Sequence, residues 1–178
     1  MPTLAKTLAA TGVTALCLTA TPVPAHAATT ISCKVSGQAQ YMPGAQRLLQ
    51  PDLVMQQRRV WNCVDRGNLG VATARLTANF TGVDLSCGAR NFSTATGWVT
   101  IVWTIRGVEQ TSKAQVAITE VAGNTAKVSG TVKSGQFLGR PFTGRFDTTL
   151  FGGTGTCISG SGIGNSITTT FKGDFSVG

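Results

Sequence analysis

Histidine and acidic residues are both scarce in this sequence. Its only histidine is His26, and only seven of its 178 residues are acidic. His26 lies in a segment that we predict is removed, which leaves the working chain without imidazole. This loss excludes Ser-His-Asp and Cys-His catalysis. No serine lies three residues before a lysine, so the S-x-x-K arrangement is missing as well.

Long apolar runs are missing too, and no stretch reaches the roughly 18 uncharged apolar residues that a membrane span needs. The longest candidate, residues 8–20, follows Lys6 and precedes a small-x-small pattern that ends at Ala27. A signal peptidase accepts this arrangement. We therefore predict that residues 1–27 are a secretion signal cleaved after Ala27. Residues 28–178 would form one secreted domain, and a retained N-terminal anchor is the alternative.

The cysteines form no C-x-x-C pair, and no histidine remains to complete a zinc site, which argues against a structural metal. Four cysteines follow the signal: Cys33, Cys63, Cys87 and Cys157. An even count in an exported chain predicts two disulfides. We prefer Cys33–Cys63 with Cys87–Cys157, because these bonds would clip two successive halves of the chain. The nested and crossed pairings stay open.

A sustained 3.6-residue apolar repeat is also missing, whereas apolar and polar residues alternate along most of the chain. Residues 72–80 and 99–105 show this alternation, and turn signals such as Gly123 separate the runs. The pattern predicts an all-β domain, a single antiparallel sandwich or barrel of about eight or nine strands. Residues 45–57 are ambiguous, although Pro51 argues against a continuous helix there.

Basic residues are plentiful, and the chain carries a formal net charge of +8. Arg58, Arg59 and Arg66 surround Trp61, an interleaving that is typical of sites for anionic polymers. A solvated strand face is the alternative explanation, since no longer basic run exists. Secretion argues against nucleic acid as the partner. A cell-wall polymer, a glycan, a membrane surface or another secreted protein fits better.

Two tryptophans lie five residues apart, at Trp98 and Trp103. In an unbroken strand this spacing puts them on opposite faces. We expect one of them in the core and the other outside, where it would either be covered by a loop or serve as a platform for a sugar ring. Trp98 therefore joins Trp61 among the candidate binding residues.

Paired carboxylates are the main catalytic arrangement that the composition permits. A glycosidase needs two of them facing each other, roughly 5–9.5 Å apart. Asp84 and Asp147 are the least ordinary of the seven acids, but a turn cap and a solvated strand position explain them without catalysis. The glycine-rich stretch 152–164 lacks the G-x-G-x-x-G and G-K-[ST] patterns, so it predicts turns and no phosphate site.

Several short motifs follow one another along the chain: CKVSG, SCGA, GWVTIVW, SGTVKSGQFLG, and a late cysteine before a glycine cluster. This layout, over residues 31–177, resembles small secreted four-cysteine β-rich proteins of actinobacteria that have no assigned function. The resemblance implies a disulfide-clipped all-β fold. It brings no catalytic or cofactor-binding residues.

These observations favour a secreted, non-enzymatic module for surface recognition or the cell envelope, without cofactor or metal. A lectin-like module would show an exposed tryptophan beside polar groups in a shallow groove. The first alternative is a carboxylate-dependent polysaccharide hydrolase, which needs a cleft. The second is an inhibitor of secreted proteases, which needs a protruding loop pinned by a disulfide, for example residues 135–141 or the turn at Tyr41 to Pro43.

Overall fold

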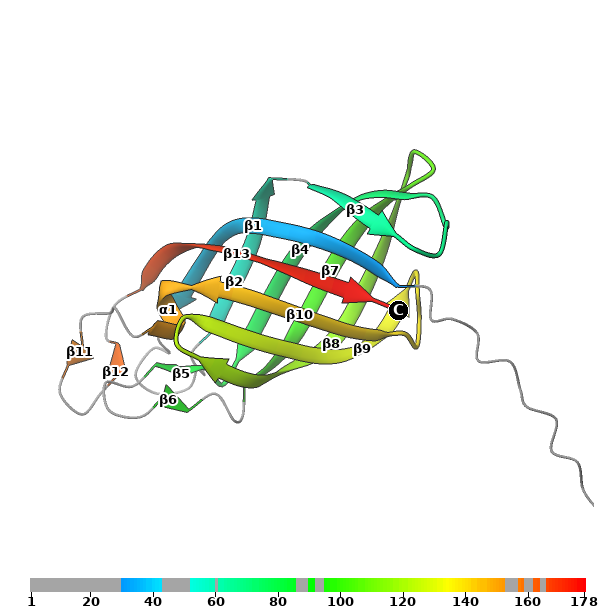
Figure 1. Ribbon diagram of the computed structural model, residues 1–178. Coiled ribbons are helices and arrows are strands. Elements are labelled where there is room, and N and C mark those ends of the chain that lie inside the picture. The colour runs from blue at the N-terminus through cyan, green and yellow to red at the C-terminus, as the bar shows by residue number, and fades with distance from the viewer. Residues whose placement is uncertain are drawn as a thin grey trace, which may run out of the picture.

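The fold was obtained as a computed structural model. It describes residues 30–42, 52–59, 61–85, 90–91, 95–152, 157–158, 162–163 and 166–178. These residues form an all-β protein whose main sheet closes into an eight-stranded antiparallel barrel with one extra strand (Figure 1). This confirms the predicted fold class and decides between sandwich and barrel in favour of the barrel.

The long strands of the barrel are β1 (Ile31–Met42), β2 (Asp52–Arg59), β3 (Trp61–Asp65), β4 (Val71–Thr81), β7 (Thr96–Ile105), β8 (Val108–Ala122), β9 (Thr125–Gly135), β10 (Pro141–Thr148) and β13 (Ile167–Val177). Two short pairs lie outside the main sheet: β5 (Asp84–Leu85) with β6 (Arg90–Asn91), and β11 (Cys157–Ile158) with β12 (Gly162–Ile163). A single helical turn, α1 (Thr149–Gly152), follows β10.

The barrel closes between its first and last strands. The order around the wall is β13, β10, β9, β8, β7, β4, β2 and β1, and β1 pairs back to β13 from Ile31↔Val177 to Tyr41↔Ile167. The extra strand β3 shares the place of β2 between β1 and β4. In Figure 1 the blue β1 and the red β13 run side by side along the length of the barrel.

The period-two alternation fills the barrel with apolar side chains. Its largest fully buried residues include Trp103, Phe142, Phe146 and Phe175. An eight-stranded barrel has an interior just wide enough for side chains to fill. Trp98, in contrast, is 50% exposed, so the predicted split between the two tryptophans is confirmed.

Trp103 is the centre of one half of the core. Its indole Nε1 donates to Ser112 Oγ at 2.8 Å, and the hydroxyl of Ser112 donates to the carbonyl of Gln136. Its ring packs edge-on against Phe137 at 5.2 Å between centroids and also contacts Phe175. The loop after β9 therefore covers this end of the core and satisfies the buried indole N–H at the same time.

Glycines let the wall curve where neighbouring strands approach closely. A Cβ placed on Gly130 or Gly173 would lie 2.0 Å from a backbone carbonyl oxygen of the adjacent strand, and one on Gly97 would lie 2.2 Å away. Strand glycines of this kind mark a close backbone approach or a bend in a barrel.

A break in the wall separates β2 from β3. Pairing of β2 with β4 ends at Gln56↔Thr77, and β3 resumes it at Trp61↔Ala74. The buried side chain of Gln57 spans this interval, donating to Ala74 O at 3.3 Å and accepting from Leu76 N at 2.7 Å. Its amide replaces the strand pairing that the break removes.

The Cys33–Cys63 disulfide closes the same seam, with a Cα–Cα distance of 4.3 Å across the paired strands β1 and β3. This confirms one half of the preferred connectivity. Cys87 lies outside the described residues, so its pairing with Cys157 stays a prediction. The predicted signal, residues 1–27, also lies outside them. In the described part of the chain, no helix is both long and apolar enough to span a bilayer.

Candidate functional site

Charged side chains of both signs lie in rows on the outer wall formed by β1, β13, β10 and β9. In one row, cross-strand pairs join Lys34, Asp174, Arg145 and Lys127 in that order. Directly paired residues have Cβ atoms about 4.5–5.5 Å apart, so neighbours in a row are within reach of each other. The row therefore presents one anionic group, Asp174, among three cationic ones.

A second row lies one step along the strands, where pairs join Ser36, Lys172, Asp147 and Thr125. The hydroxyl of Thr125 donates to Asp147 Oδ1. Asp147 is half-buried, which differs from the solvated position expected of it, because the side chain is held against its neighbour. Together the two rows make a polar surface with both donors and acceptors.

Trp61 lies at the edge of this surface and is 38% exposed. Its indole Nε1 donates to Ser36 Oγ at 3.2 Å, which anchors the ring from β3 against β1. An open hollow of about 290 Å³ lies beside the ring. Its lining consists of Lys34, Val35, Ser36, Trp61, Asp147, Lys172, Gly173 and Asp174. We call this hollow the Trp61 groove.

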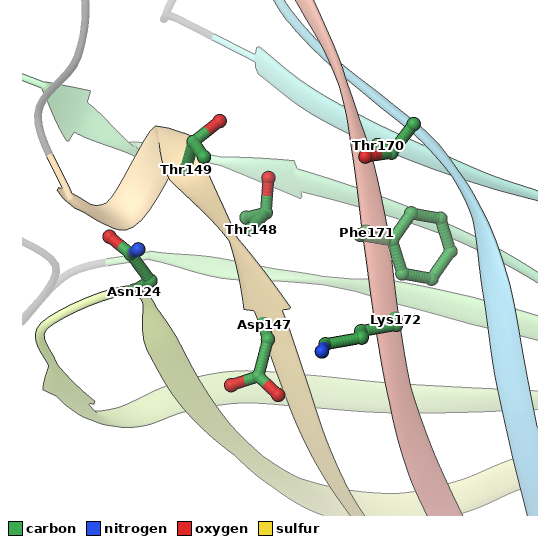
Figure 2. Close-up of a pocket in the computed structure, with 7 residues that line it drawn as sticks. All are labelled: Asn124, Asp147, Thr148, Thr149, Thr170, Phe171 and Lys172. Atoms are coloured by element: carbon green, nitrogen blue, oxygen red, sulfur yellow. The ribbon is translucent and has the colours of Figure 1, made fainter.

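Two more hollows adjoin the Trp61 groove. One, of about 340 Å³, shares Asp147 and Lys172 with it and extends to Thr149 and Asn124. Figure 2 shows Asp147 and Lys172 projecting side by side from β10 and β13 into this hollow. The other, of about 270 Å³, shares Asp174 and extends over β10 and β9. The three hollows share lining residues and so lie next to one another on the wall, and together we call them the depression.

Asp147 and Asp174 are the two carboxylates of this depression. They lie on adjacent strands and are offset diagonally, since Asp147 pairs with Lys172 whereas Asp174 pairs with Arg145. Both therefore lie side by side on one wall and do not face each other across a cleft. The side chain of Asp84, the other carboxylate singled out above, lies outside the described part of the structure.

The candidate binding residues do not form one site. Trp98 lies on β7, whereas Trp61 lies on β3, and β4 separates the two strands. Their partners on β4, Asn79 and Ala74, are five positions apart. The two rings are thus separated by about 17 Å along the strands and about 10 Å around the wall.

Of the three arginines expected to cluster around Trp61, only Arg66 has a side chain that the structure describes. Arg66 is exposed in the turn between β3 and β4. The backbone of Arg58 and Arg59 belongs to β2, and their side chains lie outside the described residues. The groove residues Lys34, Ser36, Lys172 and Asp174 were not expected from the sequence.

The turn that carries Arg66 is organised by Asp65. The carboxylate of Asp65 accepts backbone N–H bonds from Gly67, Gly70 and Val71 at 3.0, 2.8 and 3.0 Å. Burial raises the pKa of Asp65, but the backbone bonds lower it more, so its pKa lies below the ordinary value. The ionised carboxylate therefore stabilises the turn.

We expect Asp65→Asn to lower the free energy of unfolding by about 1 kcal/mol at neutral pH, a value discounted for solvent exposure. A lowered folded-state pKa contributes stability above the unfolded pKa of about 3.9 and loses it as pH falls through the folded pKa. The variant should therefore lose less stability than the wild type on acidification below about pH 4. Urea denaturation across this pH range measures both effects.

Glu109→Gln is the matched control, because it removes an exposed carboxylate that meets Arg75 only at 3.7 Å. We expect it to change stability by less than about 0.5 kcal/mol. Equal losses in the two variants would contradict the role given to the Asp65 carboxylate.

The inhibitor hypothesis requires a protruding loop pinned by a disulfide, and the described residues of the two candidate loops do not show this arrangement. In residues 135–141, Phe137 packs on Trp103, while Gly139 N and Arg140 N bond back to Val132 O and Phe137 O. At the other candidate turn, Tyr41 is 3% exposed and Pro43 lies outside the described residues. The disulfide that the structure describes lies in the barrel wall between β1 and β3 and does not pin either loop.

Among the described residues, no group of three or more His, Cys, Asp or Glu side chains gathers as a metal site would require. Comparison of the chain with protein-family models, with curated proteins and with solved structures finds no match.

Proposed function

We propose that this protein is a secreted, non-enzymatic recognition module whose side wall binds a hydroxyl-rich polymer such as a cell-wall glycan. The observation that supports this proposal most directly is the position of Trp61. Its partly exposed ring is anchored beside a groove that holds both carboxylates and ammonium groups. An exposed tryptophan beside polar groups in a shallow groove is the arrangement that a lectin-like module requires.

The mixture of groups in the Trp61 groove suits sugars better than polyanions. A sugar hydroxyl both donates and accepts hydrogen bonds, so it pairs with Asp147 and Asp174 as well as with Lys34 and Lys172. The apolar face of a sugar ring would stack on the indole. Grooves for nucleic acids and similar polyanions are predominantly cationic, and two carboxylates in the groove would repel such a ligand.

The length of the depression favours a polymer over a single sugar. The hollows on either side of Asp147, Lys172 and Asp174 continue the groove across β10 and β9. A linear chain crossing the strands would meet both donors and acceptors along its length. The same open geometry favours binding over hydrolysis, because the two carboxylates do not flank a bond from opposite sides.

We expect Trp61→Ala to weaken glycan binding by about 30-fold. The 38% of the ring that is exposed amounts to about 95 Å² of apolar surface, and its burial under a sugar contributes about 2 kcal/mol. Isothermal titration with a panel of purified cell-wall glycans, after a pulldown has identified a retained glycan, measures this change.

Trp98→Ala is the matched control, because it removes another exposed tryptophan, 50% exposed, from the distant strand β7. It should leave the affinity within about twofold, or about 0.4 kcal/mol. Failure of every glycan to be retained would refute the proposal, and so would an equal loss of affinity in both variants.

A further inference from the structure

One end of the barrel is surrounded by three turns. They connect β3 to β4, β7 to β8, and β9 to β10, and they lie together at the end of the barrel where the C-terminus is marked in Figure 1. Backbone bonds tie the end together. Arg106 N bonds to Gly70 O at 2.9 Å, and Gly178 N bonds to Pro141 O at 3.2 Å.

The three turns share a chemistry, because an exposed aliphatic residue lies in or directly beside each turn, two positions from an exposed arginine. The aliphatic residues Val64, Val108 and Leu138 are 60%, 61% and 67% exposed. They are three of the six large apolar side chains exposed in the described part of the chain. The arginines, all exposed, are Arg66, Arg106 and Arg140.

The acidic side chains of Asp65 and Glu109, which lie near this end, already have partners. The carboxylate of Asp65 is held by backbone N–H groups of its own turn. Glu109, near the β7–β8 turn, meets Arg75 at 3.7 Å. The three arginines therefore give the end a positive field that the neighbouring acids do not cancel.

We propose that this end of the barrel docks on the surface of an anionic lipid bilayer. Arginines near such a surface are attracted by its negative potential, while aliphatic side chains in and beside the turns insert among the headgroups. Separate turns placed around a barrel mouth suit a planar target. A compact protein partner would instead favour one contiguous apolar patch.

The docking surface goes beyond the proposed function and leaves the Trp61 groove free on the side wall.

Co-sedimentation with vesicles tests the proposal. We expect the protein to bind phosphatidylcholine vesicles that contain phosphatidylglycerol, to bind pure phosphatidylcholine weakly, and to dissociate as salt rises. Arg66→Gln, Arg106→Asn and Arg140→Gln should each weaken partitioning about fivefold, and together about 100-fold. Asparagine is chosen at residue 106 because it tolerates the left-handed backbone there, where φ is 49°.

Lys113→Gln is the control for net charge, because it removes one exposed cation that belongs to the wall strand β8 and to none of the three turns. It should change partitioning by less than about twofold, whereas the combined change Val64→Ser, Val108→Ser and Leu138→Ser should reduce it at least tenfold. All variants share one N-terminus, so a retained leader cannot produce these differences, and thermal unfolding verifies that each variant folds.

Three outcomes would overturn the docking surface: no binding to anionic vesicles at low salt, equal effects of Lys113→Gln and the single arginine changes, or serine variants that bind like the wild type. The last result would instead indicate a soluble polyanion as the partner. Trp61→Ala should leave vesicle binding unchanged, so failure of the glycan proposal and failure of this one are distinguishable.

Discussion

Replacing Cys33 and Cys63 together by alanine should lower the free energy of unfolding by about 3.5 kcal/mol. The bond closes a loop with a sequence separation of 30, and releasing it returns that much chain entropy to the unfolded state. A shift of the urea midpoint at constant slope measures this loss.

Reduction of the wild type provides the comparison. If Cys87 and Cys157 are also bonded, reductant should destabilise the wild type further than the double substitution does, and it should destabilise the variant as well. A variant whose midpoint equals that of the oxidised wild type would contradict the stabilising role of the bond. Peptide mapping under non-reducing conditions identifies the partner of Cys87 directly.

Gly173→Ala should cost about 3 kcal/mol, because the new methyl group has no space. A Cβ on Gly173 would lie 2.0 Å from Arg145 O and 3.1 Å from Phe146 Cα, both backbone atoms of β10. The two strands would have to separate, which weakens their ladder and the packing of Phe146 beneath it. Thermal or urea unfolding reports the change.

Gly139→Ala is the matched control, since its φ of 82° disfavours alanine but nothing lies within 4 Å of the added Cβ. We expect it to cost about 1 kcal/mol from backbone strain alone. A loss in Gly173→Ala no greater than this would show that β13 and β10 do not approach as closely as described.

Much of the wall could be predicted because alternation is a local property. In β7, a single unbroken run sends Trp103 inward and Trp98 outward, as the five-residue spacing requires. The Gly123-Asn124 turn likewise connects β8 to β9 where the turn signal lies. Closure is different, because it depends on the register between Ile31 and Val177 at opposite ends of the sequence. No local pattern distinguishes a closed barrel from two packed sheets.

The groove was only partly visible in the sequence for the same reason. Trp61 was recognisable as an aromatic residue among arginines, a signal confined to a few neighbouring positions. Ser36 and Lys172 become neighbours only through the pairing of β1 with β13. Their side chains look like ordinary outward strand positions until that register is known. Gln57 was missed likewise, because the break that its amide repairs is a feature of the sheet.

The pairing of β1 with β13 also determines when this chain can fold. Until residue 177 has been synthesised, β1 has no partner along one side, and an unpaired edge of eleven positions stays open. Contacts between such distant residues form slowly, since the intervening loop must first be brought together. The barrel therefore cannot close until its last strand has been made, which suits the export through a translocation pore that we predict from residues 1–27.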